Sequence, residues 1–151
     1  MKALTLHQPW ASFVALGVKT IETRSWSTEY RGPLAIHAGA RQVHTGKFLL
    51  LARQARIAKK ITVEQERAFR SLDVPFGSVV ATCELVDVVP VTVEEQWSSF
   101  IGAHGRTWKL FEQRPYGDFT PGRYAWLLAD VKPLDDPVPA KGKQGLWSWE
   151  P

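Results

Sequence analysis

The chain has 151 residues, of which 44% are hydrophobic and 23% are charged, a balance that suits one globular domain and excludes a disordered chain. Its single cysteine, Cys83, cannot form an intramolecular disulfide, and its four histidines are scattered singly, which excludes the spacing of a zinc site. The formal net charge of +4 favours polyanionic partners but falls short of a dedicated basic tail. We therefore expect a single domain over 1–151 that is cytoplasmic, uses no cofactor or metal and does not enter a membrane.

The first quarter of the chain alternates strands with one short helix. Residues 2–6 predict a strand, and Pro9 opens an apolar helix that Gly17 ends. Residues 19–26 have the two-residue period of a strand, yet both of its faces are largely polar. After a turn at 30–33, another strand is expected over 34–38.

Two helices and a long strand are expected next. Residues 46–60 carry a broad apolar stripe, and the Thr62–Gln65 capping box opens a second helix that extends to about 72. Residues 77–91 are rich in β-forming side chains and predict a long strand.

The last third predicts one helix, one loop and two strands. Thr92 and Glu95 form a second capping-box pattern, which predicts a short helix to 101. Turn residues fill 102–122 and indicate a long functional loop, followed by a strand over 123–132 and a final strand in the tail beyond Pro139. The fold class is therefore α+β, with a small mixed barrel of about six strands and inserted helices.

The polar strand is the most informative segment. Lys19, Glu22 and Arg24 place an ammonium, a carboxylate and a guanidinium within six residues. A solvated edge strand whose charges pair at the surface is one explanation. A functional cleft is the other, although residues 19 and 22 point to opposite faces of a regular strand and would need a bulge or twist to act together.

The motifs around this strand resemble the ASCH domain family. The run G-x-K-x-x-E-x-R over 17–24 follows a helix opened by Gln8-Pro9-Trp10, and the runs over 31–38 and 122–126, with the strand around Glu84, are similar to the bacterial and phage branch. The resemblance covers nearly the whole chain and implies a PUA-like β-barrel with a cleft that recognises a nucleobase or single-stranded RNA.

One bacterial branch of this family consists of N4-acetylcytidine amidohydrolases, whose site combines a Lys, a Thr three residues later and a Glu from another segment. Lys19 matches the Lys, whereas Glu22 occupies the position of the Thr. The resemblance implies an amidohydrolase acting on N4-acylated cytidine, with Lys19, Glu22 and Glu84 as catalytic candidates. A non-catalytic RNA-binding module is the alternative, followed by a ribonuclease, for which the scattered histidines offer no acid–base pair.

Substrate-binding candidates surround these three residues. Arg24 and Trp26 share the face of Glu22, where they would grip a phosphate and stack a base, although Trp26 could equally pack in the core. The remaining candidates are Gln8, Pro9, Trp10, His37 and Tyr124. For Trp10 and Trp126 core packing is the favoured role, and for His37 a hydrogen-bonded structural role.

Two further basic groups allow two interpretations. Arg53, Arg56 and Lys60, with Lys59 beside them, form one helix face, and Lys141, Lys143 and Gln144 lie in the tail. Either group is a solvated surface or a phosphate track beside the cleft. The expected partner is a nucleoside or single-stranded RNA, and the expected assembly is a monomer or weak dimer.

Overall fold

A mixed six-stranded sheet organises the chain in the computed structural model, which describes residues 1–42, 46–92, 99–101 and 105–151. Its strands are β1 (Lys2–Leu6), β2 (Ile21–Arg24), β3 (Gly32–Ala38), β4 (Ser78–Pro90), β7 (Tyr124–Pro139) and β8 (Leu146–Ser148). They lie in the order β2-β7-β4-β3-β1-β8, in which β1 and β3 are parallel and the other neighbours antiparallel. The expected α+β class with a small mixed barrel of about six strands is confirmed.

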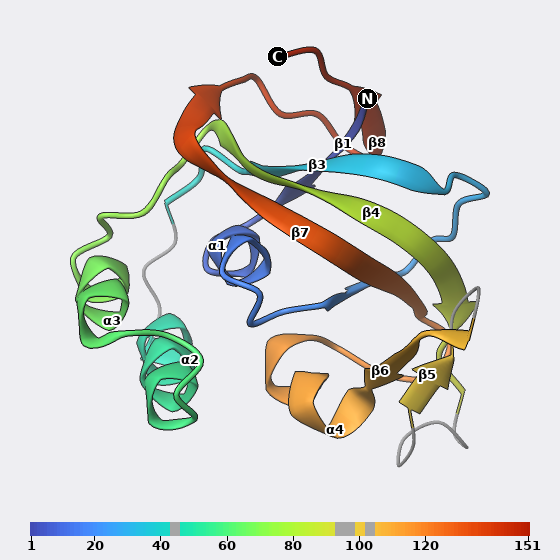
Figure 1. The fold of residues 1–151 in the computed structure, drawn as a ribbon, viewed down its shortest axis with the longest axis horizontal. Coiled ribbons are helices and arrows are strands. Elements are labelled where there is room, and N and C mark those ends of the chain that lie inside the picture. Colours follow the sequence, from blue (N-terminus) through green and yellow to red (C-terminus); the bar gives the residue numbers. More distant parts are fainter. Residues whose placement is uncertain (43–45, 93–98, 102–104) are drawn as a thin grey trace.

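The sheet curls around the short helix α1 (Trp10–Ala15), which lies inside its concave face (Figure 1). Ala11 and Val14 of α1 are fully buried there and pack in one apolar cluster with Leu34 of β3 and Trp126 of β7. Burial of Trp126 confirms the core role expected for it. Because α1 fills the centre of the curl, the residues that flank it are held at fixed positions.

Irregular pairing between β4 and β7 accounts for the curl. The register shifts three times along this pair, between Val79 and Ala81, Thr82 and Glu84, and Leu85 and Asp87, and such irregularities bend a strand and increase its twist. The strand expected over 123–132 in fact continues to Pro139. Pro133 is accommodated within β7 because it pairs opposite Ala81 beside a register shift, where proline is tolerated.

Helices α2 (Gly46–Ile57) and α3 (Val63–Arg70) lie side by side at one end of the sheet (Figure 1). The expected capping box is present: the Thr62 hydroxyl accepts from the Gln65 N–H, and the Gln65 side chain accepts from the Thr62 N–H. The two helices bury a second apolar cluster against Phe13 of α1. They therefore extend the wall on one side of α1.

The basic group Arg53, Arg56 and Lys60, which we call the α2 face although α2 ends at Ile57, is partly neutralised by neighbouring carboxylates. Arg56 forms an ion pair with Glu66 of α3. Lys60 Nζ lies 3.8 Å from an oxygen of Glu112 and 5.8 Å from the ring centroid of Tyr116. Of the three cations expected to line this face, two thus have protein partners.

Two expectations for 92–122 are wrong within the described residues. The predicted helix reached 101, but β5 (Ser99–Ile101) is a strand that pairs with β6 (Thr107–Lys109); residues 93–98 of that helix lie outside the described part. The predicted loop contains β6, α4 (Leu110–Gln113) and the 3-10 helix η3 (Arg114–Tyr116). Burial of Trp108 and Leu110 against β2 and β7 orders this segment despite its turn residues.

In the part of the chain that the structure describes, no helix has both the length and the apolar character needed to cross a membrane.

Candidate functional site

A pocket of about 430 Å³ opens between β2, the start of α1 and the segment that follows η3. Among the residues that line it are Trp10, Lys19, Glu22, Arg24 and Trp26, so five of the expected site residues meet in one place. This volume lies within the range of small-molecule sites in proteins. Among the described residues, no three metal-ligating side chains gather here or elsewhere.

The turn at the end of α1 places Lys19 in the pocket. Gly17 has φ +71°, a conformation that favours glycine, and the N–H groups of Gly17 and Val18 donate back to Val14 and Phe13. The chain then turns sharply inward, and Lys19 is 1% exposed. Because β2 begins only at Ile21, Lys19 is free of the alternation of the strand, and no bulge is needed for it to reach Glu22.

Three oxygens surround the Lys19 ammonium. Nζ donates to the carbonyl oxygens of Ile21 at 2.8 Å and Tyr116 at 2.5 Å, and it lies 3.1 Å from Oε2 of Glu22. It also lies 5.5 Å from the ring centroid of Trp10. These contacts match the three N–H donors of an ammonium, which makes its burial tolerable.

Burial lowers the pKa of Lys19 from its ordinary value, and the attraction of the Glu22 carboxylate opposes this shift. The amine therefore gives up a proton more readily than an exposed lysine. A cation with this property beside a carboxylate is a common feature of catalytic sites.

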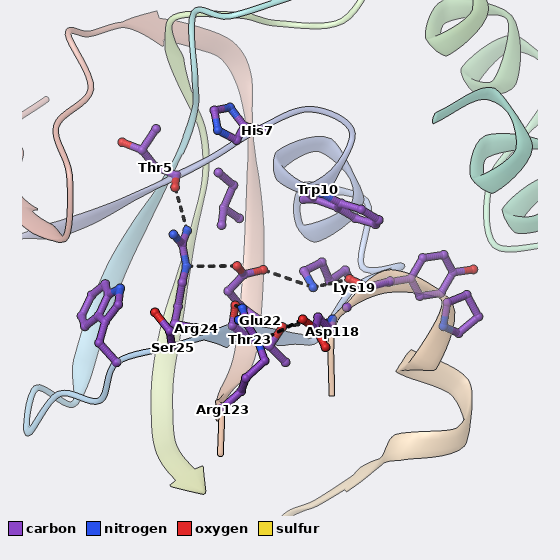
Figure 2. A pocket seen from close by; sticks show the side chains of 15 residues that line it. Thr5, His7, Trp10, Lys19, Glu22, Thr23, Arg24, Ser25, Asp118 and Arg123 are labelled. Atoms are coloured by element: carbon purple, nitrogen blue, oxygen red, sulfur yellow. Dashed lines mark hydrogen bonds and ion pairs between the residues drawn. The ribbon is translucent and has the colours of Figure 1, made fainter. Parts of the chain in front are cut away.

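Glu22 continues the chain of contacts on its other side, as Figure 2 shows. Its Oε1 lies 3.1 Å from Nε of Arg24, and Nη2 of Arg24 donates to the carbonyl oxygen of Thr5 at 2.8 Å. Glu22 is 8% exposed. The explanation of these charges as solvated surface pairs is therefore wrong, since Lys19 and Glu22 are both buried although β2 is an edge strand of its sheet.

Two further residues of the lining, Asp118 and Arg123, were missed by sequence reasoning, and both contact Thr23 of β2. Thr23 Oγ1 accepts from the N–H of Asp118 at 3.2 Å, and Arg123 donates to the Thr23 carbonyl oxygen at 3.2 Å. Asp118 thus brings a second carboxylate to the lining, together with Arg123. Arg123 lies in one of the motifs of the family resemblance, and Asp118 in the turn-rich stretch, so signals for both were present.

Aromatic rings supply the apolar part of the wall. Trp26 is half-buried and meets the ring of Trp126 edge-on at 4.7 Å between centroids. Trp10 is also half-buried and packs against Phe13 at 6.2 Å. Each tryptophan therefore lies between the apolar core and the pocket. Core packing and substrate binding, the two roles considered for these residues, are compatible.

Five expected residues do not line this pocket: Gln8, Pro9, His37, Glu84 and Tyr124. Gln8 binds the Ser12 hydroxyl and the Pro75 carbonyl oxygen and accepts from the Ser12 N–H, so it fixes the first turn of α1, for which Pro9 is the N-cap. Tyr124 packs on the edge of the apolar core. Glu84 is half-exposed in the middle of β4.

His37 lines a second pocket instead. Its Nε2 donates to the carbonyl oxygen of Ala140 at 2.9 Å, as expected for a hydrogen-bonded structural histidine. Burial lowers the pKa of this imidazole, which favours its neutral form. Arg24 and Trp26 belong to both pockets, so the two are adjacent.

Comparison with known proteins decides the family. The profile of the ASCH domain matches residues 4–138 of the chain. The chain belongs to the ASCH domain family. Activating signal cointegrator 1 from Homo sapiens is 34% identical over 84 residues, which are 56% of this chain and 14% of that protein, and the protein of that name from Mus musculus is 31% identical over 107 residues, which are 65% and 18%. The chain thus matches less than a fifth of the length of these two relatives.

Solved ASCH structures share the fold. The ASCH protein from Zymomonas mobilis superposes with a TM-score of 0.53 at 17% identity, covering 99% of this chain and 87% of that one. A single-substitution variant of it gives 0.52 at 18% identity with the same coverage. This structural similarity is consistent with the PUA-like barrel that the ASCH resemblance implies.

Proposed function

We propose that the first pocket binds a nucleobase and hydrolyses the N4-acyl amide of a cytidine-type nucleoside. The observation that carries this proposal is the Glu22 carboxylate, held between the Lys19 ammonium and the Arg24 guanidinium in the wall of the pocket. Hydrolysis of an amide needs a base for the attacking water, a positive charge for the oxyanion and a proton for the leaving nitrogen. Glu22, Lys19 and Arg24 together supply the base, the positive charge and the proton.

Glu22 is the general base of the proposed reaction. It accepts a proton from water while the water oxygen bonds to the acyl carbon, and Lys19 and Arg24 stabilise the oxyanion that forms. The same proton then passes from Glu22 to the exocyclic N4, and the C–N bond breaks. The products are the free carboxylic acid and cytidine, so atoms and charge balance without a cofactor.

The rest of the lining suits a base. Trp10 and Trp26 bring apolar ring surface to the wall, and the Thr23 hydroxyl of β2 and the Asp118 carboxylate provide polar groups. Thr23 directly follows Glu22, which occupies the Thr position of the related amidohydrolases. Glu84, the third catalytic candidate, takes no part because it lies outside the pocket lining.

The test is release of cytidine from N4-acetylcytidine, followed by ultraviolet absorbance. Glu22→Gln keeps the shape of the side chain and removes the base, so kcat should fall by about 100-fold or more. Lys19→Ala should also abolish turnover, with circular dichroism to verify folding. Arg53→Ala, an exposed cation of α2 outside both pockets, is the control and should retain full activity. Absence of release by the folded wild-type protein would overturn the proposal.

A non-catalytic RNA-binding module is the second candidate function. All three N–H donors of Lys19 already have acceptors within the protein, so none is left to bind a reacting oxygen, and this favours the alternative. A site of this kind would hold a base without turning it over. Salt-dependent binding of single-stranded RNA by a protein that releases no cytidine would select this alternative.

A further inference from the structure

The second pocket continues the first and has a volume of about 720 Å³. The two pockets share Thr5, His7, Arg24 and Trp26, three of which are labelled in Figure 2 above and beside Glu22. Arg24 therefore stands at their boundary, with Nε toward Glu22 and Nη2 on the Thr5 carbonyl oxygen. A ligand that fills the first pocket and extends past Arg24 enters the second.

The charged side chains that line the second pocket are all basic. Its lining contains Arg24, Arg41, Lys141 and Lys143 and no aspartate or glutamate from the described residues. Lys141 and Lys143 are exposed, as is Arg41. Cations spread over a wall of this size match a polyanion better than a single carboxylate or phosphate group.

The segment that carries the two lysines, 140–145, is fixed to the sheet at several points. The His37 imidazole donates to the Ala140 carbonyl oxygen at 2.9 Å, and the Thr5 hydroxyl donates to the Lys143 carbonyl oxygen at 3.1 Å. Gly142 lies directly on the imidazole, where a Cβ would be 2.7 Å from Nδ1. The backbone that presents Lys141 and Lys143 is therefore held in place before any ligand arrives, which reduces the entropy lost on binding.

We propose that the second pocket binds the phosphodiester and the nucleotide next to the base held in the first pocket. The substrate is then an acylated cytidine within single-stranded RNA, and a free nucleoside fills only half of the site. This inference rests on the proposed function of the first pocket. Single-stranded RNA is required because a base must leave its stack to enter a pocket, while its neighbour remains linked through the backbone.

The experiment compares N4-acetylcytidine with a short oligoribonucleotide that contains one N4-acetylcytidine. Lys141→Ala/Lys143→Ala is the test variant, and Arg53→Ala/Lys132→Ala, which removes two exposed cations outside both pockets, is the matched control. Turnover and fluorescence-anisotropy binding are measured for each protein. We expect the test variant to lose about tenfold in kcat/KM and in affinity for the oligonucleotide, with unchanged turnover of the nucleoside, and the control to match the wild type in both.

The outcomes separate this inference from the proposed function. Turnover of both substrates with no effect of the test variant would overturn the second pocket as a binding site and leave the hydrolase intact. Absence of turnover, with oligonucleotide affinity reduced only in the test variant, would overturn the hydrolase and support the binding site. Equal losses of oligonucleotide affinity in the test and control variants would show that only the overall positive charge matters, and this would also overturn the inference.

Discussion

Lys19 and Glu22 form a buried ion pair, so substitution of one member affects the stability of the fold as well as the proposed chemistry. Lys19 contacts two carbonyl oxygens besides Glu22 and is 1% exposed. Removal of one member of such a pair leaves the other charged and desolvated, which costs more than removal of both. To separate the effect on stability from the effect on catalysis, each residue must be substituted alone and both must be substituted together.

We expect Lys19→Met to lower the free energy of unfolding by about 3 kcal/mol, because Glu22 and two carbonyl groups lose a partner. Adding Glu22→Gln to this variant should recover part of the loss, since the buried carboxylate that retains only Arg24 as a cationic partner is then gone. Urea unfolding of the two single variants and the double variant measures the interaction. Strict additivity of the two effects would show that the pair is not coupled.

His37 gives the fold a pH dependence of defined sign. Burial lowers the pKa of its imidazole below the ordinary value of 6.5, so on acidification the unfolded chain binds a proton that the folded chain resists. The free energy of unfolding should therefore decrease as the pH falls through about 6.5. Urea unfolding of the wild type at a series of pH values should show this slope, and His37→Gln should reduce it. The same substitution at His7, which is exposed, is the matched control; an unchanged slope in the His37 variant would contradict the assignment.

At the scale of elements, the segment between β7 and β8 depends on one glycine. A Cβ at Gly142 would lie 2.9 Å from the Thr5 hydroxyl oxygen and collide with the His37 ring. We expect Gly142→Ala to destabilise the protein by about 1–3 kcal/mol, because such overpacking forces the backbone to move. Thermal unfolding measures the effect.

A matched alanine substitution is available at Gly46, the first residue of α2, where nothing lies within 4 Å of an added Cβ. Gly46→Ala should be neutral or slightly stabilising, because it restricts the unfolded chain without a clash. If the two variants unfolded at the same temperature, the contact between Gly142 and His37 would have no structural importance.

The sequence predicted most elements, and its errors have physical causes. The Thr62–Gln65 capping box and the Gly17 helix end are local signals, and both are present in the structure. The strand at 99–101 and the elements after 105 are stabilised by contacts with β2 and β7, which no local pattern reveals. In the same way, Lys19, Glu22 and Arg24 were recognisable as one motif, whereas the turn-rich stretch that contains Asp118 did not indicate that this carboxylate reaches the pocket.

At the scale of the molecule, the distribution of charge predicts how RNA binding depends on salt. Two of the cations on the α2 face have carboxylate neighbours, whereas Arg41, Lys141 and Lys143 line a pocket without any from the described residues. Each phosphate contact with a single strand contributes about −0.7 to the slope of log K against log salt, so three contacts predict a slope of about −2. Anisotropy titrations with a short single-stranded RNA over a range of salt concentrations measure it. A slope steeper than about −4 would mean that cations outside the second pocket also contact phosphates, and the footprint on RNA would then extend well beyond the two pockets.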